Sequence, residues 1–251
     1  MGLFIVEFDL RSRSPTTVEN GCVIIDKGYS TVTVRSVRAA SDEDTINKAR
    51  LKAEAFLNEL CWRYGITLEI GSSLTVAPQD SSATRHVKRY EVKLKVKGGH
   101  RKKFPRTLEE VAIKPSDSKA LYRRAAICQY PFDKFRNLFL VIENVASKIV
   151  KDWSNETELI KLALQTCFSP RLQDLEHFIG QYGFEYKGDI IDQVASELYG
   201  NYRLGLFHSK ANRDKKIPFN LEDERKVQRI LPLADFVAKS LLSYEDTYLL
   251  F

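Results

Sequence analysis

Hydrophobic and polar residues alternate along much of the first third of the chain, as they do in strands with one buried face. Four segments have this alternation, or the β-branched content that accompanies it: residues 3–10, 30–39, 66–77 and 89–98. Between the first two, the sequence VIIDKGY predicts a turn at Lys27-Gly28, because glycine there favours a tight reversal. The first third is therefore predicted to be rich in strands.

One helix is expected to interrupt this pattern. Between Ser41 and Gly65 the apolar residues recur three and four positions apart, which is the spacing of one helix face. Ser41 or Asp42 can cap the amino-terminal end, acidic residues occupy the first turn, and Gly65 is suited to end the helix. An amphipathic helix is predicted over residues 41–65.

After Pro115 the spacing becomes helical throughout. Gly98-Gly99 and the stretch that leads to Pro115 form the expected domain boundary. Beyond it, helical periodicity marks five segments: residues 131–150, 155–167, 170–183, 189–208 and 221–250. The sequence thus predicts an α+β domain over residues 1–115, with a basic strand and loop, followed by an all-α helical bundle over residues 116–251.

The formal net charge of +6, from 39 basic and 33 acidic residues, is unevenly placed. Between Arg85 and Arg106 there are ten basic residues and one acid, Glu91, which leaves 29 basic and 32 acidic residues elsewhere. Alternating lysines would share one face of the strand predicted over 89–98, and further cations follow in the loop. The candidate nucleic-acid-binding residues are Lys93, Lys95, Lys97, Arg101, Lys102 and Lys103.

Two interpretations of this basic segment stay open. Its density of positive charge fits a track for the phosphates of RNA or DNA. Alternatively, its lysines protect an edge strand from pairing with other chains. Tyr90 and Phe104 are the aromatic residues available there for base stacking, so sequence-specific reading of single strands is not indicated.

The remaining composition favours a cytoplasmic protein. Four cysteines lie far apart among apolar neighbours, which predicts buried free thiols: Cys22, Cys61, Cys128 and Cys167. Four histidines show no metal-ligand spacing, so neither a metal nor another cofactor is expected: His86, His100, His177 and His208. The first residues, with Glu7 and Asp9, do not resemble a signal peptide, and no run approaches the roughly 18 apolar residues of a membrane span.

The stretch YRLGLFH at 202–208 places Arg203 and His208 in an otherwise apolar helix. On a regular helix, five residues correspond to a rotation of about 500°, so the two side chains would point about 140° apart. A loosening of the helix at Gly205, or a symmetric dimer in which both copies line one cleft, would bring them together. A structural role is the alternative, because arginine near a helix end can bond the last carbonyls and histidine is favoured there by the helix dipole.

Here the chain resembles a known family. A long buried helix, FRNLFLVIENVASKIV, intermediate helices and then ELYGNYRLGLFHSK before a final helix form an order similar to that of the HEPN superfamily, and within it the ApeA-like or MauJ-like group. The signature of that family is an arginine and a histidine separated by four to six residues, and Arg203 and His208 match it. Tyr199 precedes the arginine by four positions, and Glu143 lies inside the first long helix, as in that group. The similarity covers roughly residues 117–251.

The resemblance implies a metal-independent endoribonuclease that acts as a homodimer, with arginine and histidine from both copies around one cleft. His208 would remove the proton of an attacking 2′-hydroxyl or protonate the leaving 5′-oxygen, and Arg203 would hold the phosphate. Many HEPN proteins are toxins or defence effectors. RNA, a stress or antiviral setting and a partner protein in a defence complex are therefore also implied.

One position departs from that family. The residue after the motif arginine is often polar in active members, commonly Asn, Asp or His, and here it is Leu204. The chain therefore has a second interpretation, as a non-catalytic HEPN-like dimer that binds RNA or nucleotide or serves as an interaction subunit of a larger complex. Glu143 and Tyr199 are the candidate supporting residues. Glu143 also has a purely structural interpretation, as a buried acid paired with a basic neighbour.

Overall fold

The computed structural model describes residues 2–10, 18–20, 22–25, 31–78, 88–90, 115–185, 188–207 and 220–249 of the 251-residue chain. They divide into two compact units, Met1–Ser116 and Asp117–Phe251. The first unit combines an antiparallel sheet with a helix, and the second is built from helices. This confirms the predicted succession of an α+β part and a helical part.

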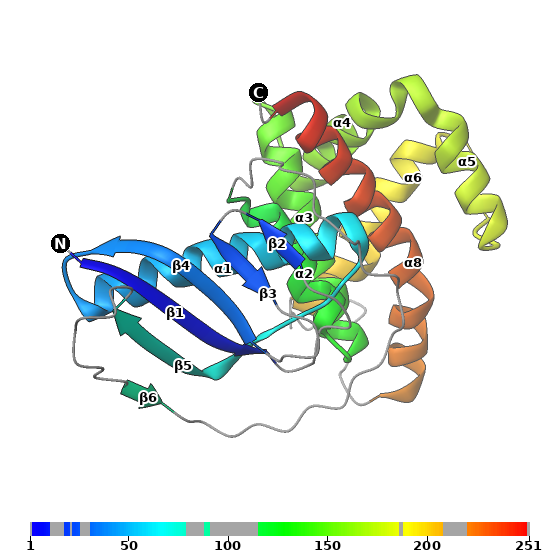
Figure 1. The fold of residues 1–251 in the computed structure, drawn as a ribbon. Helices are drawn as coiled ribbons and strands as arrows, with labels where there is room; N and C mark the ends of the chain where they lie inside the picture. Colours follow the sequence, from blue (N-terminus) through cyan, green and yellow to red (C-terminus); the bar gives the residue numbers. More distant parts are fainter. Residues whose placement is uncertain are drawn as a thin grey trace. The chain divides into compact units, whose positions relative to one another are not determined.

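Six strands in the described part of the first unit form one sheet, in the order β2-β3-β4-β1-β5-β6 (Figure 1). Their bounds are β1 Gly2–Leu10, β2 Val18–Asn20, β3 Val23–Ile25, β4 Thr31–Ala39, β5 Ile70–Pro78 and β6 Lys88–Tyr90. Because β1 lies between β4 and β5 and is antiparallel to both, β4 and β5 are parallel to each other. The connection from β4 to β5 therefore crosses over β1, and it contains the helix α1 (Asp42–Tyr64).

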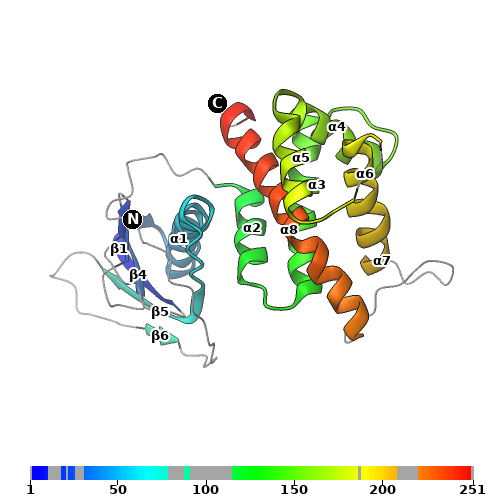
Figure 2. The same cartoon turned by 90° about the vertical axis from the view of Figure 1, so that its right-hand side faces the viewer.

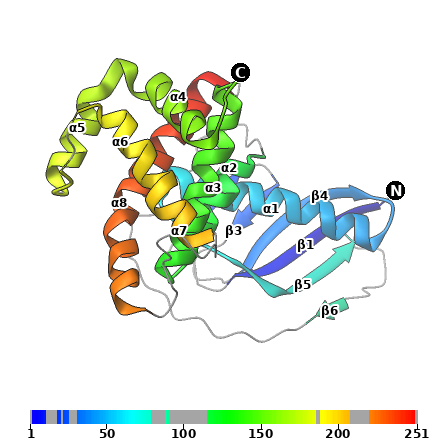
Figure 3. The same ribbon diagram turned by 180° about the vertical axis from the view of Figure 1, so that it is seen from behind.

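Both ends of α1 match the sequence signals. The Ser41 hydroxyl accepts a hydrogen bond from the Asp44 amide at 3.2 Å, and Gly65 ends the helix in the left-handed conformation, with φ 63°. The helix predicted over residues 41–65 is thereby confirmed. Figure 3 shows α1 lying across one face of the sheet. Its apolar side packs there in a core that includes these fully buried residues: Val6, Val32, Val34, Phe56, Leu57 and Leu60.

Replacement of Gly65 by alanine is expected to destabilise the first unit by about 1–2 kcal/mol, because a left-handed L-residue brings its Cβ too close to the following carbonyl oxygen. Urea denaturation of the full chain measures the change in free energy of unfolding. Gly180, within α5 (Leu172–Gln181), is the control, since an added Cβ there meets nothing within 4 Å. Gly180→Ala should stabilise by about 0.5–1 kcal/mol. Equal signs for the two substitutions would contradict the assigned backbone conformations.

The strand predictions are confirmed for residues 3–10 and 30–39 to within a residue, whereas the one over 66–77 was wrong at its start. Ile66 and Leu68 are buried, but the Ile66 amide donates to the Leu60 carbonyl at 3.3 Å, so these residues close the end of α1 before β5 begins. Apolar and polar residues alternate here because Ile66 and Leu68 are buried, and such burial does not require pairing with another strand. The predicted turn at Lys27-Gly28 lies outside the described residues.

The second unit contains α2 Asp117–Ile127, α3 Pro131–Ile149, α4 Glu156–Phe168, α5 Leu172–Gln181, α6 Ile190–Ser196, α7 Leu204–Phe207 and α8 Leu221–Tyr244. Short 3₁₀ and π-helical segments extend three of them: η1 Ser169–Arg171, η2 Glu197–Arg203 and η3 Glu245–Leu249. The periodicity had not singled out α2. The predicted segment 189–208 is divided into α6, η2 and α7 rather than forming one regular helix.

α3 is the central element of this helical unit, packed against α2, α4 and α8 (Figure 2). Its apolar stripe is broad enough to face all three neighbours, and the largest of its fully buried side chains are Phe135, Leu138, Phe139 and Ile142. This explains why apolar residues recur three and four positions apart along most of α3. It also means that any polar residue on α3 lies close to other helices.

All four cysteines are free thiols, as predicted. Cys61 and Cys167 are buried, but Cys22 and Cys128 are only half-buried, so the prediction of complete burial was wrong for these two. Burial raises the pKa of the Cys167 thiol. In the described parts of the chain, every helix is too short or too polar to cross a membrane.

Candidate functional site

Arg203 is the last residue of the π-helical segment η2, between α6 and α7. The Leu204 amide donates to the Tyr199 carbonyl, five residues earlier, which is the widened hydrogen-bond pattern of a π-helix. The helix is therefore irregular over Glu197–Arg203, whereas the sequence had suggested a loosening at Gly205. Such widening is rare and is often found at functional sites.

The side chain of Arg203 lies between a carboxylate and an aromatic ring. Its Nη2 is 3.5 Å from Oε1 of Glu143, which projects from α3, and both side chains retain about a quarter of their exposure. The guanidinium carbon lies 5.3 Å from the centroid of the Tyr199 ring, within cation–π range. The Tyr199 hydroxyl in turn donates to Oε2 of Glu156, the first residue of α4, at 3.1 Å.

Three elements thus contribute to one cluster, made of Glu143, Glu156, Tyr199 and Arg203 and called here the Arg203 cluster. The sequence had named three of its members, and the structure brings those three together. Glu156 was missed, because an acid in the first turn of a helix is ordinarily explained by the helix dipole. Only the packing of α4 beside η2 gives it a contact with Tyr199.

Burial dominates the electrostatics of this cluster. Desolvation raises the pKa of Glu143 above its ordinary value of 4.5, the positive charge of Arg203 opposes this rise, and the nearby carboxylate of Glu156 adds to it. The pKa of the Tyr199 hydroxyl is also raised, first by burial and then by its hydrogen bond to Glu156. Glu143 is therefore easier to protonate than an exposed glutamate, although the charge and a hydrogen bond of Arg203 favour its ionised form.

Aromatic packing fixes the backbone beneath the cluster. The Phe135 and Phe139 rings stack with centroids 6.0 Å apart, and they contact the rings of Tyr202 and Tyr199 at 5.7 and 6.3 Å. The Tyr202 hydroxyl donates to the Lys226 carbonyl on α8 at 3.1 Å. The carboxy-terminal end of η2 is thus attached to both α3 and α8, which limits where Arg203 can move.

Several candidate residues from the sequence lie outside the described residues, and their placement stays a prediction. They are His208, Lys93, Lys95, Lys97, Arg101, Lys102 and Lys103. Of the basic segment 85–106, the structure describes β6, which pairs with β5 and stands at one end of the strand order. Among the described residues, no group of three histidine, cysteine or acidic side chains is arranged to hold a metal ion.

The cluster offers a planar, permanently charged donor near the surface, held in place by an acid and a ring. Such a donor suits the binding of a phosphate or carboxylate. Comparisons with known proteins returned no match: neither a family model, nor a curated protein, nor a solved structure resembles this chain at a significant level.

Glu143→Gln is expected to make stability less dependent on pH. Because the folded-state pKa of Glu143 is raised, the native protein holds this proton more tightly than the unfolded chain does. The contribution of Glu143 to the free energy of unfolding should therefore fall as pH rises from 4.5 through that raised pKa, and Glu143→Gln should remove this contribution. Thermal unfolding at about pH 4 and about pH 8 measures the effect.

Glu158 on α4 provides a control of opposite sign. Hydrogen bonds from Ser154 lower the pKa of Glu158, so its ionised form is favoured in the native protein. Glu158→Gln should therefore lose stability at neutral pH and little at acidic pH. If both substitutions shifted the profile in the same direction, the burial of Glu143 would not be the dominant influence on its pKa.

Proposed function

We propose that the helical unit is a HEPN-like, metal-independent endoribonuclease that acts as a homodimer. One observation carries the proposal: the Arg203 guanidinium is held at the partly exposed surface by Glu143 and Tyr199, five residues before the histidine of the motif. An arginine with only a packing role would not need an acid and a ring from two elements to orient it. The arrangement supports a binding role for Arg203.

In the proposed reaction, the 2′-hydroxyl oxygen of a nucleotide attacks its own 3′-phosphate, and the bond to the leaving 5′-oxygen breaks. A neutral His208 of one subunit accepts the proton of the 2′-hydroxyl as the base, and a protonated His208 of the other subunit gives its proton to the leaving 5′-oxygen as the acid. Arg203 stabilises the charge that develops on the phosphate oxygens. The products are a 2′,3′-cyclic phosphate and a free 5′-hydroxyl.

Glu143 and Tyr199 serve as positioning residues in this proposal. When the face of the planar guanidinium lies over the Tyr199 ring, its N–H donors, which lie in the plane of the group, can still reach a phosphate. The pair with Glu143, at 3.5 Å, is longer than the roughly 2.7–2.9 Å of a strong charge-assisted hydrogen bond. An incoming phosphate therefore competes with a loosely bound carboxylate.

A labelled single-stranded RNA incubated with purified protein and EDTA tests the proposal. We expect cleavage that leaves cyclic phosphate ends, together with resistance of the same sequence carrying 2′-O-methyl groups, because these lack the attacking hydroxyl. Absence of cleavage, or cleavage of the 2′-O-methyl strand, would contradict the mechanism. The setting in stress or antiviral defence, and a partner protein, are parts of the proposal that rest on the resemblance alone.

A second candidate function is favoured by the acids of the same cluster. Glu143 and Glu156 give it two carboxylates against one guanidinium, and both repel a phosphate. Together with Leu204 at the position after the arginine, this supports a non-catalytic HEPN-like dimer that binds RNA or nucleotide or joins a larger complex. Salt-sensitive RNA binding without cleavage would favour it over the nuclease.

A further inference from the structure

The two carboxylates of the Arg203 cluster have different surroundings. Glu156 is the first residue of α4, where the helix dipole favours a negative charge, and its Oε2 accepts a hydrogen bond from the Tyr199 hydroxyl. Glu143 projects from α3, is 25 % exposed, and its Oε1 lies 3.5 Å from Nη2 of Arg203. A proton that enters the cluster is therefore expected on Glu143, whose ionised form has less support.

The field at Glu143 comes mainly from within the cluster. Arg203 of η2 and Glu156 of α4 are the charged groups that most affect its protonation, and they act in opposite directions. Other charged groups on α3 and on the elements packed against it form ion pairs with one another: Lys148 with Glu245, Lys119 with Asp246, Lys161 with Asp192, Lys226 with Glu222, and Lys239 with Asp235. A change at Arg203 is therefore felt directly by Glu143.

An anion bound to Arg203 changes the charge balance of the cluster. With both acids ionised, the cluster carries two negative charges and one positive charge. A phosphodiester adds a third negative charge beside the same guanidinium and competes with Glu143 for it. Protonation of Glu143 removes one of these negative charges and ends the competition. Burial and the charge of Glu156 already raise the pKa of Glu143, so this acid is prepared to accept the proton.

We propose that Glu143 is a proton-dependent competitor for Arg203: its carboxylate pairs with the guanidinium in the ligand-free protein, and it takes up a proton when a phosphodiester binds there. Acidic conditions then favour the bound phosphodiester, and alkaline conditions favour the internal ion pair. The inference rests on the proposed function in one respect, the binding of phosphate by Arg203. It does not depend on cleavage.

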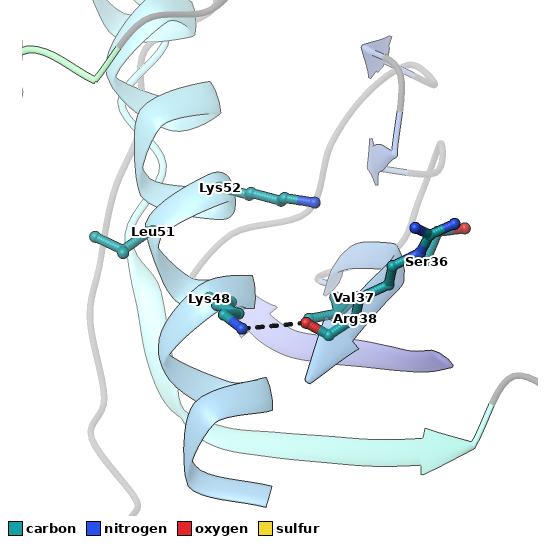
Figure 4. A pocket seen from close by; sticks show the side chains of 6 residues that line it. All are labelled: Ser36, Val37, Arg38, Lys48, Leu51 and Lys52. Atoms are coloured by element: carbon teal, nitrogen blue, oxygen red, sulfur yellow. Dashed lines mark hydrogen bonds between the residues drawn. The ribbon is translucent and has the colours of Figure 1, made fainter. Parts of the chain in front are cut away.

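A groove in the first unit differs from this site in its chemistry. It has a volume of about 400 Å³ and lies between β4 and α1 (Figure 4). Its exposed lining is almost wholly apolar, and the Lys48 ammonium, which lines it, already donates to Asp44 at 2.7 Å and to the Arg38 carbonyl at 3.3 Å. Such a surface does not select an anion, so it should not obscure the binding of a phosphodiester by Arg203.

Fluorescence anisotropy with a 2′-O-methyl oligouridylate tests the proposal, because this probe lacks the attacking hydroxyl and keeps a constant charge between about pH 4 and about pH 8. All variants carry His208→Ala, so that the imidazole of the motif does not titrate. Glu143→Gln should bind about three- to fivefold more tightly than its parent at about pH 8, where it removes the competing charge, and equally at about pH 4.

Glu176→Gln is the matched control. Glu176 is an exposed acid on α5, so the substitution removes the same charge from the helical unit at a position outside the Arg203 cluster. Its affinity should stay within about 1.5-fold of the parent at both pH values, because charges in solvent are screened. An equal gain in Glu176→Gln would show that net charge, and not competition at Arg203, determines the affinity.

Titration of the Glu143 carboxyl carbon by nuclear magnetic resonance provides a second measurement, with the signal assigned by its loss in Glu143→Gln. The pKa of Glu143 should lie above 4.5 in the free protein and should rise further when the oligouridylate is bound. Glu156→Gln should lower the pKa of Glu143, since the charge of Glu156 contributes to its rise. A purely structural role of Glu143 predicts no change of its pKa on binding.

Three outcomes would contradict the proposal: equal affinities of Glu143→Gln and its parent at about pH 8, weaker binding by Glu143→Gln there, or an unchanged or lowered pKa of Glu143 in the bound protein. Arg203→Ala separates these failures from that of the proposed function. If Arg203→Ala binds as tightly as its parent at both pH values, Arg203 does not bind the phosphate and both proposals fail. If Arg203→Ala weakens binding but Glu143→Gln has no effect, only the role of Glu143 is wrong.

Discussion

Arg203→Ala is expected to lower the rate of RNA cleavage about 10²–10³-fold, because it removes the donor proposed to stabilise charge on the phosphate in the transition state. The helical unit should stay folded, since Arg203 is partly exposed and its ion pair with Glu143 is loose. Single-turnover cleavage of a labelled RNA measures the rate. His208→Ala should give a loss of about 10²–10⁴-fold, the usual contribution of a general acid or base.

Two further variants separate a catalytic role from a loss of charge. Arg203→Lys keeps the positive charge but loses the planar fork of donors, so its rate should lie between those of the wild type and Arg203→Ala. Arg229→Ala removes an exposed arginine from α8 and should cleave at the wild-type rate. Wild-type rates in both Arg203→Ala and His208→Ala would show that the observed cleavage comes from a contaminant.

Phe139→Ala is expected to destabilise the helical unit by about 3–5 kcal/mol, the usual cost of truncating a fully buried phenylalanine. Phe139 is 1 % exposed and contacts both Phe135 and Tyr199, so its removal leaves a cavity between α3 and η2. Urea unfolding followed by far-ultraviolet circular dichroism measures the loss, because helices dominate this unit. Cleavage should also weaken under conditions where the variant is still folded, since Tyr199 supports Arg203.

Leu221→Ala is the control for this substitution. Leu221 begins α8 and is 63 % exposed, so its truncation should change the free energy of unfolding by less than about 0.5 kcal/mol. Phe139→Leu should fall between the two, because leucine fills part of the space of the ring. A loss below about 1 kcal/mol in Phe139→Ala would contradict the packing of α3 against η2.

The predictions for Arg203 and Phe139 depend on contacts between helices, which the periodicity of the sequence does not reveal. The sequence pointed to Glu143 and Tyr199 through their resemblance to a family, and it left open whether Glu143 was a supporting residue or a buried acid with a basic partner. The structure identifies that partner as Arg203 itself. A structural and a functional role for Glu143 are therefore not exclusive, because an acid that positions Arg203 also pairs with it.

The sequence by itself determined the local elements of this protein. Ser41 and Gly65 set the ends of α1, Asn155 caps α4, and the apolar stripe of residues 131–150 gives α3. These features were predictable because capping and amphipathic spacing depend on residues within a few positions of one another. The change from strands to helices near residue 116 followed from the same short-range patterns.

Only the tertiary structure decided which distant groups meet. The contact of Glu156 with Tyr199 and the ion pair of Arg203 with Glu143 both join residues of separate elements. Their relative positions depend on how whole helices and strands pack, and packing is a property of the assembled core and not of any short segment. For this reason the Arg203 cluster contains a residue, Glu156, that the linear pattern alone does not distinguish from an ordinary surface position.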